Sequence, residues 1–153
     1  EMMMKPFAFP LGLCLLVLMA PTANAKPTTC RAWSGMEGPY MGDATLEGLG
    51  GAAEDRAGRP IILLNPDQLN AFPPLAREFW LAHSCGHHAL IPDYNPETEA
   101  DCFAMRSLRK KKIRTPERLQ ALIEELRSLP EGAWAEHTPD AARIDALEAC
   151  ETE

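Results

Sequence analysis

Three of the four histidines lie in one short stretch whose spacing suits a metal ion. His83 and His87 are four residues apart, so on a helix their imidazole rings stand on one face, one turn apart. Two imidazoles at this spacing can share one metal ion. Further along the chain, Glu97 and Asp101 repeat the four-residue spacing with carboxylates. We expect the third histidine of the stretch, His88, to be a surface or core residue rather than a ligand.

The two pairs meet if the helices that carry them are adjacent. The connection at residues 91–94 is short, which predicts antiparallel neighbouring helices. Counting back from the turn places Glu97 opposite His87, and Asp101 opposite His83. Two histidines and one carboxylate form a known ligand set of catalytic zinc, with a fourth position left for water. The spacing therefore predicts one Zn²⁺ site, with Asp101 fixing the tautomer of a ligand histidine.

A purely structural interpretation competes with the metal site. Two histidines can fall four residues apart by chance, and Glu97 would also suit the first turn of a helix. Asp101 has no such role, because an aspartate in the middle of a helix is a poor helix former. The matching register of the acidic pair therefore favours the metal site.

The elements that must position these residues are mostly helical. A helix is expected after Pro73-Pro74 and up to about residue 90, since apolar residues there follow helical spacing. Three later segments begin alike, each with a polar N-cap, a proline and an acid in the first turn: Asn95-Pro96-Glu97, Thr115-Pro116-Glu117 and Thr138-Pro139-Asp140.

The part of the chain before these helices contributes little regular structure to the prediction. Residues 60–64 are apolar and partly β-branched, which predicts one strand. Residues 30–59 contain seven of the ten glycines and show little periodicity, so we expect irregular loops there. The fold class expected is therefore mainly α with a small β element.

The N-terminus has the pattern of a secretory signal. Lys5 precedes an apolar run, and Ala23-Asn24-Ala25 is a typical cleavage site. A transmembrane anchor and a lipoprotein anchor at Cys14 are the alternatives. The apolar run is shorter than the roughly 20 residues of a membrane helix, and Cys14 lies inside it. We expect residues 1–25 to be removed and residues 26–153 to form a single domain, secreted or periplasmic.

Charge argues against one class of partner. The net charge is −7, whereas nucleic-acid binding depends on neutralising phosphates with cations. The basic run at residues 109–112 is expected to be the solvated end of a helix, complementing its dipole. We therefore expect no nucleic-acid partner.

Four cysteines follow the signal: Cys30, Cys85, Cys102 and Cys150. An even number in an exported domain predicts two disulfides, with three connectivities open. Thiolate metal binding is the alternative, but no C-x-x-C pair exists. Because Cys85 and Cys102 lie on the two predicted site helices, we expect a bond between them, and a second bond between Cys30 and Cys150.

The sequence resembles the gluzincin-type zincin metallopeptidases, whose pattern is H-E-x-x-H followed by E-x-x-A-D on the next helix. Here the corresponding residues are 83–87 and 97–101, and residues 136–144 resemble the H-P-x-x-x-x-R-I segment of the group that includes the CAAX-processing proteases. The resemblance implies a compact zincin-like core with His83, His87 and Glu97 as zinc ligands. His137 becomes the reserve candidate for an active-site role. The resemblance also implies that residues 60–64 form a strand whose edge binds an extended peptide or protein substrate.

One position departs from the family pattern. Ser84 stands where the family has the glutamate that acts as general base. A serine hydroxyl cannot accept a proton from zinc-bound water at neutral pH, and a positioned base contributes roughly 10²–10⁴-fold in rate. The sequence thus predicts an exported zinc-binding protein, a possible pseudoenzyme, with weakened or lost peptide hydrolysis. A non-enzymatic binding module and an active peptidase with a non-standard base are the alternatives.

Overall fold

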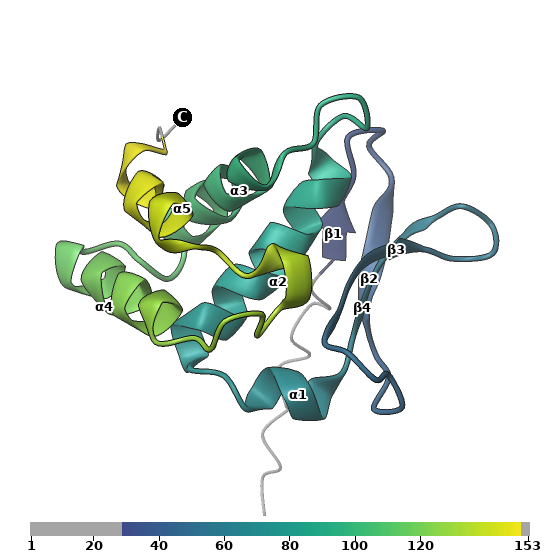
Figure 1. Cartoon of the computed structure of the whole chain (residues 1–153). Coiled ribbons are helices and arrows are strands. Elements are labelled where there is room, and N and C mark those ends of the chain that lie inside the picture. The colour runs from purple at the N-terminus through teal and green to yellow at the C-terminus, as the bar shows by residue number, and fades with distance from the viewer. Residues whose placement is uncertain (1–28, 151–153) are drawn as a thin grey trace, which may run out of the picture.

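The computed structural model describes residues 29–150, which form a small sheet and a layer of helices (Figure 1). One long helix, α2 (Pro74–Ala89), lies between the sheet and the remaining helices, and contacts both. The strands are β1 (Thr29–Arg31), β2 (Glu37–Gly42), β3 (Gly50–Glu54) and β4 (Pro60–Leu64). The other helices are α1 (Pro66–Asn70), α3 (Glu97–Arg109), α4 (Pro116–Arg127) and α5 (Ala141–Ala146), with short 3₁₀ helices η1 (Ala135–His137) and η2 (Leu147–Ala149).

The sheet corrects two expectations. Its strand order is β1-β2-β4-β3, so three strands form within the segment expected to be loops. Glycines make β2 and β3 poor strands by propensity, yet two of them are required. A Cβ on Gly38 would collide with the carbonyl oxygen of Pro60, and one on Gly50 with that of Leu63. β4 is confirmed as a strand, but it pairs with β2 on one side and β3 on the other. The expectation that residues 60–64 form an edge strand is therefore wrong, and a peptide partner stays a prediction.

The helix starts follow the predicted signals in part. Thr115 caps α4 as expected, because its hydroxyl accepts a hydrogen bond from the Arg118 amide. α3 begins at Glu97 without a side-chain cap, since the amide of Asn95 is used elsewhere. α5 begins after Asp140, which is the cap in place of Thr138.

The packing of α2 against α3 confirms the predicted helix pair. Gly86 lies at the contact, where a Cβ would come within 3.1 Å of the Ala100 Cα atom. Because α2 and α3 approach closely at Gly86 and Ala100, side chains that flank this contact on the two helices also meet. Phe79 and Trp80 of α2 are fully buried in the core, together with Met105 of α3.

The disulfide pairing predicted from the sequence is wrong. Cys30 of β1 is bonded to Cys85 of α2, and Cys102 of α3 is bonded to Cys150 at the end of η2. Cys85 faces the sheet and Cys102 faces the C-terminal segment, so the two helices are packed together without a bond between them. Each disulfide instead ties a site helix to a segment distant in sequence.

The predicted signal at residues 1–25 and the alternative anchor at Cys14 lie outside the described residues. Among the helices that the structure describes, none has the length and apolar character needed to cross a bilayer.

Candidate metal centre

Four side chains meet where α2 and α3 face each other. His83 and His87 project from α2, Glu97 begins α3, and His137 reaches in from η1. One ligand atom from each lies within 4.8 Å of the others. The predicted trio is thus brought together as expected, and His137 joins it.

The spacing of the ligand atoms matches a tetrahedral metal site. The Nε2 atoms of His83 and His87 are 3.1 Å apart, and each is 3.2 Å from an oxygen of Glu97. Zinc–ligand bonds of 2.0–2.1 Å place neighbouring ligands of a tetrahedron about 3.3 Å apart. The three side chains therefore need only small shifts to hold one Zn²⁺.

Hydrogen bonds to the outer nitrogens orient both imidazoles. Nδ1 of His83 lies 2.9 Å from an oxygen of Asp101, and Nδ1 of His87 lies 2.8 Å from Oδ1 of Asn95. The Asn95 amide nitrogen donates to the carbonyl of His87, which leaves Oδ1 to accept from the ring. In the neutral rings the protons are then on Nδ1, and two Nε2 lone pairs face each other. The two lone pairs repel each other unless a proton or a metal cation binds between the two Nε2 atoms.

A partly buried arginine links the two carboxylates. Arg143 donates to both oxygens of Asp101 at 2.7 Å and lies 3.3 Å from Glu97. Asp101 is 2% exposed, so this pair and the contact with His83 compensate for burying its charge. Asp101 is therefore held in place beside Nδ1 of His83.

His137 is the residue whose importance the spacing did not predict. Its Nδ1 lies 3.0 Å and 3.2 Å from the two oxygens of Glu97. Ala135, two residues earlier, has a φ of 51°, which a residue with a side chain seldom adopts. This costly turn directs His137 toward the cluster. The only sequence signal for it was the resemblance of residues 136–144.

The environment perturbs the titration of the cluster. Burial favours neutral His83, but hydrogen bonds to Asp101 and Glu97 outweigh it, so its pKa is raised. Burial lowers the pKa of His87 and the positive neighbours add to this, despite its bond to Asn95. Burial opposes ionisation of Glu97, yet its hydrogen bond to His83 and the histidine charges lower its pKa to about 2. The centre thus holds a fixed carboxylate charge facing imidazole nitrogens.

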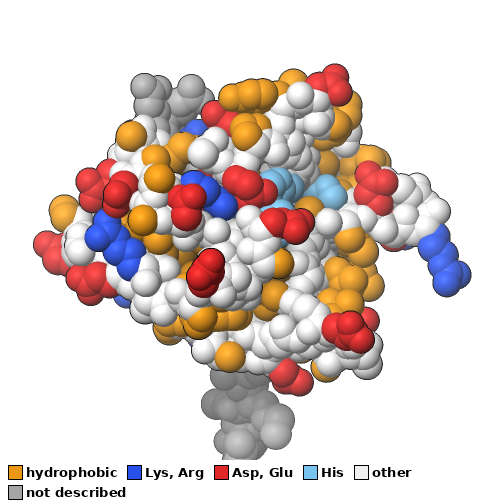
Figure 2. All heavy atoms as spheres, viewed as in Figure 1, with side chains coloured by type: hydrophobic (Ala, Val, Ile, Leu, Met, Phe, Trp, Pro, Cys, Tyr) orange, Lys and Arg blue, Asp and Glu red, His pale blue; other side chains and the backbone are white. Residues whose placement is uncertain are grey.

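The other predicted residues lie outside this group. Nε2 of His88 lies 2.9 Å from the carbonyl oxygen of Ile61 in β4, so its side chain is directed to the sheet. Ser84 is buried on α2 beside His83. Glu136 is 85% exposed, with an oxygen 3.9 Å from Nε2 of His137. Figure 2 shows histidine side chains visible at the surface among acidic and basic ones, so solvent reaches the centre.

Comparison of the chain with protein-family models, with curated proteins and with solved structures finds no match. The case for a function therefore depends on the site itself.

Proposed function

We propose that this protein is an exported zinc-binding protein with a metallopeptidase-like centre whose peptide hydrolysis is weakened or lost. The observation that carries the proposal is the pair of Nε2 atoms of His83 and His87, 3.1 Å apart beside the Glu97 carboxylate. Each ring is held with this nitrogen inward by its own hydrogen-bond partner, as is usual for metal-ligating histidines.

The donor set favours zinc among the biological metals. Calcium and magnesium prefer all-oxygen sites, whereas imidazole suits zinc and other transition metals. Zinc accepts tetrahedral geometry from mixed nitrogen and oxygen ligands, which the spacing of this cluster fits. Two disulfides in the described residues agree with an oxidising compartment such as the periplasm or the medium.

Three features argue against efficient hydrolysis. Ser84 offers no base to activate a water, and the two carboxylates at the centre are both engaged in orienting or binding. His137 is also close enough to be a fourth protein ligand. Zinc sites with four protein ligands are closed and structural, whereas catalytic sites keep a position for water.

One observation favours the alternative of an active peptidase. The carboxylate of Glu136 lies 3.9 Å from Nε2 of His137. The Glu136 side chain is exposed, so it can change rotamer and move toward the metal position. In this alternative His137 leaves the fourth position to water and Glu136 acts as the base. Chelator-sensitive hydrolysis by the wild-type protein that Glu136→Gln abolishes would support it.

The experiment that tests the proposal is a zinc titration of metal-free protein against a competing chelator. The wild type should bind one Zn²⁺ per chain, and alanine at His83, His87 or Glu97 should nearly abolish binding. His88→Gln is the matched control, since His88 lies on the same helix outside the cluster. A parallel assay with an unstructured peptide should show little hydrolysis. Absence of zinc binding would contradict the proposal and favour the alternative of a non-enzymatic binding module.

A further inference from the structure

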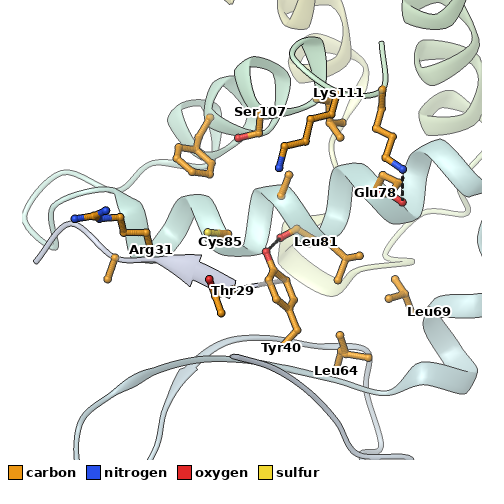
Figure 3. A pocket seen from close by; sticks show the side chains of 15 residues that line it. Thr29, Arg31, Tyr40, Leu64, Leu69, Glu78, Leu81, Cys85, Ser107 and Lys111 are labelled. Carbon is orange, nitrogen blue, oxygen red and sulfur yellow. Dashed lines mark hydrogen bonds and ion pairs between the residues drawn. The ribbon is translucent and has the colours of Figure 1, made fainter. Parts of the chain in front are cut away.

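A second hollow lies on the side of α2 that faces away from the metal centre. It is a groove of about 710 Å³ between α2, α3 and the sheet (Figure 3). Cys85 contributes to its wall, and Cys85 lies about 200° around the helix from His83 and from His87. The groove is therefore separate from the zinc ligands, and an inference about it does not rest on the zinc proposal.

Most of the wall is apolar. Leu81 lies along the α2 side, Phe103 and Leu108 come from α3, and Leu64 lies on the sheet side. Tyr40 adds its ring, while its hydroxyl donates to the carbonyl oxygen of Leu81 at 3.1 Å. The polar end of the tyrosine is thus already satisfied, and its ring is left as apolar wall. Such a groove favours an apolar ligand of up to drug size, because ligand sites typically span about 300–1,000 Å³.

The charged groups at the rim indicate which end group the ligand has. Lys112 is paired with Glu78 at 3.6 Å, so these two charges compensate each other. Lys111 also lines the groove, and no acidic partner for it lies within the described residues. Figure 3 shows its ammonium directed over α2 toward the groove, on the same side as the Ser107 hydroxyl. Among the described residues, the rim thus offers two cations without an ion pair, Arg31 at one end of the apolar channel and Lys111 beside Ser107 at the other (Figure 3).

We propose that this groove binds a long-chain carboxylate, with the alkyl chain along α2 and the carboxylate at Lys111. An uncharged apolar ligand would leave the ammonium unused, and a cationic amphiphile would be repelled by it. The net charge of −7 does not oppose this, because charges beyond about 10 Å are screened at 0.1 M salt. Burial of the alkyl chain supplies most of the affinity, and the ion pair selects the end group.

The test is a calorimetric titration of the exported protein with dodecanoate at 0.1 M salt. Lys111→Gln should weaken binding by roughly fivefold, the upper range for an exposed ion pair. Lys110→Gln is the matched control, because Lys110 is the adjacent exposed lysine and does not line the groove. Dodecylamine carries the same alkyl chain with the opposite charge, and should bind more weakly than dodecanoate to the wild type.

Three results would overturn the proposal. The first is no binding of dodecanoate up to about millimolar concentration, where a ligand that buries a long alkyl chain should saturate the site. The second is an equal loss of affinity in Lys111→Gln and Lys110→Gln, or none in either. The third is equal binding of dodecylamine and dodecanoate. Both variants replace exposed side chains, so circular dichroism is expected to show the wild-type fold.

Discussion

The carboxylate of Asp101 accepts a hydrogen bond from Nδ1 of His83 at 2.9 Å, and this contact decides which ring nitrogen faces the metal centre. Both residues are buried, so no water can replace either partner at low cost. Arg143 in turn holds Asp101 through two hydrogen bonds of 2.7 Å. The orientation of His83, a proposed zinc ligand, is therefore fixed by a chain of contacts that ends at α5.

From this contact we predict that Asp101→Asn weakens zinc binding by roughly 10- to 100-fold, as losses of an orienting partner typically do. The amide can present its nitrogen to the ring, which would favour the wrong tautomer. Competition titration measures the effect. Asp93→Asn is the control, since Asp93 is an exposed residue of the connection between α2 and α3. Equal affinity of Asp101→Asn and wild type would show that the contact does not orient the ligand.

Acid should destabilise the metal-free protein partly through Glu97. Its pKa is lowered from 4.5 to about 2 in the folded state. A lowered pKa stabilises the fold above pH 4.5, and this contribution is lost as the pH falls from 4.5 through about 2. Glu97→Gln should therefore lose less stability than the wild type over that range in urea unfolding. Glu99→Gln is the control, since Glu99 lies two residues further along the same helix and outside the cluster.

Restoring the base position should raise hydrolysis. Ser84→Glu places a carboxylate next to His83, where the resembling family has its general base. We expect chelator-sensitive cleavage of an unstructured peptide to exceed that of the wild type, and to rise further when His137→Ala opens the fourth metal position. Ser84→Ala should leave zinc affinity unchanged, because Ser84 is outside the ligand group. Brisk chelator-sensitive cleavage by the wild type would mean that another base acts.

Both disulfides should be detected by peptide mapping and should contribute to the free energy of unfolding. Non-reducing peptide mapping should recover the Cys30–Cys85 and Cys102–Cys150 links. Replacing both Cys102 and Cys150 with serine reopens a loop of 48 residues, which costs about 4 kcal/mol of unfolding free energy in the chain-entropy model. A Cys85–Cys102 link in the map would contradict the packing of α2 against α3, in which Cys85 is bonded to Cys30.

The sequence predicted the contacts that depend on local spacing. His83 and His87 are one turn apart on one helix, and the short connection to α3 made Glu97 and Asp101 their neighbours. These relationships need only helix geometry and a tight turn, which is why they could be worked out from residue positions alone.

The contacts that depend on the path of the chain could not be predicted in this way. His137 reaches Glu97 across 40 residues, and Cys30 reaches Cys85 across 55. Both depend on how η1 and β1 pack against α2 and α3, which no local pattern encodes. β3 was not predicted for another reason. Four of its five residues are glycine or alanine, whose low strand propensity is overridden by pairing with β4.

The most direct test of the proposed zinc centre is X-ray absorption spectroscopy of the protein loaded with one equivalent of Zn²⁺. The account predicts four nitrogen or oxygen ligands at about 2.0–2.1 Å, with scattering from three imidazoles in the wild type and two in His137→Ala. A shell of six oxygens without imidazole scattering, or a sulfur ligand at about 2.3 Å, would contradict the assignment of His83, His87, Glu97 and His137 as the centre.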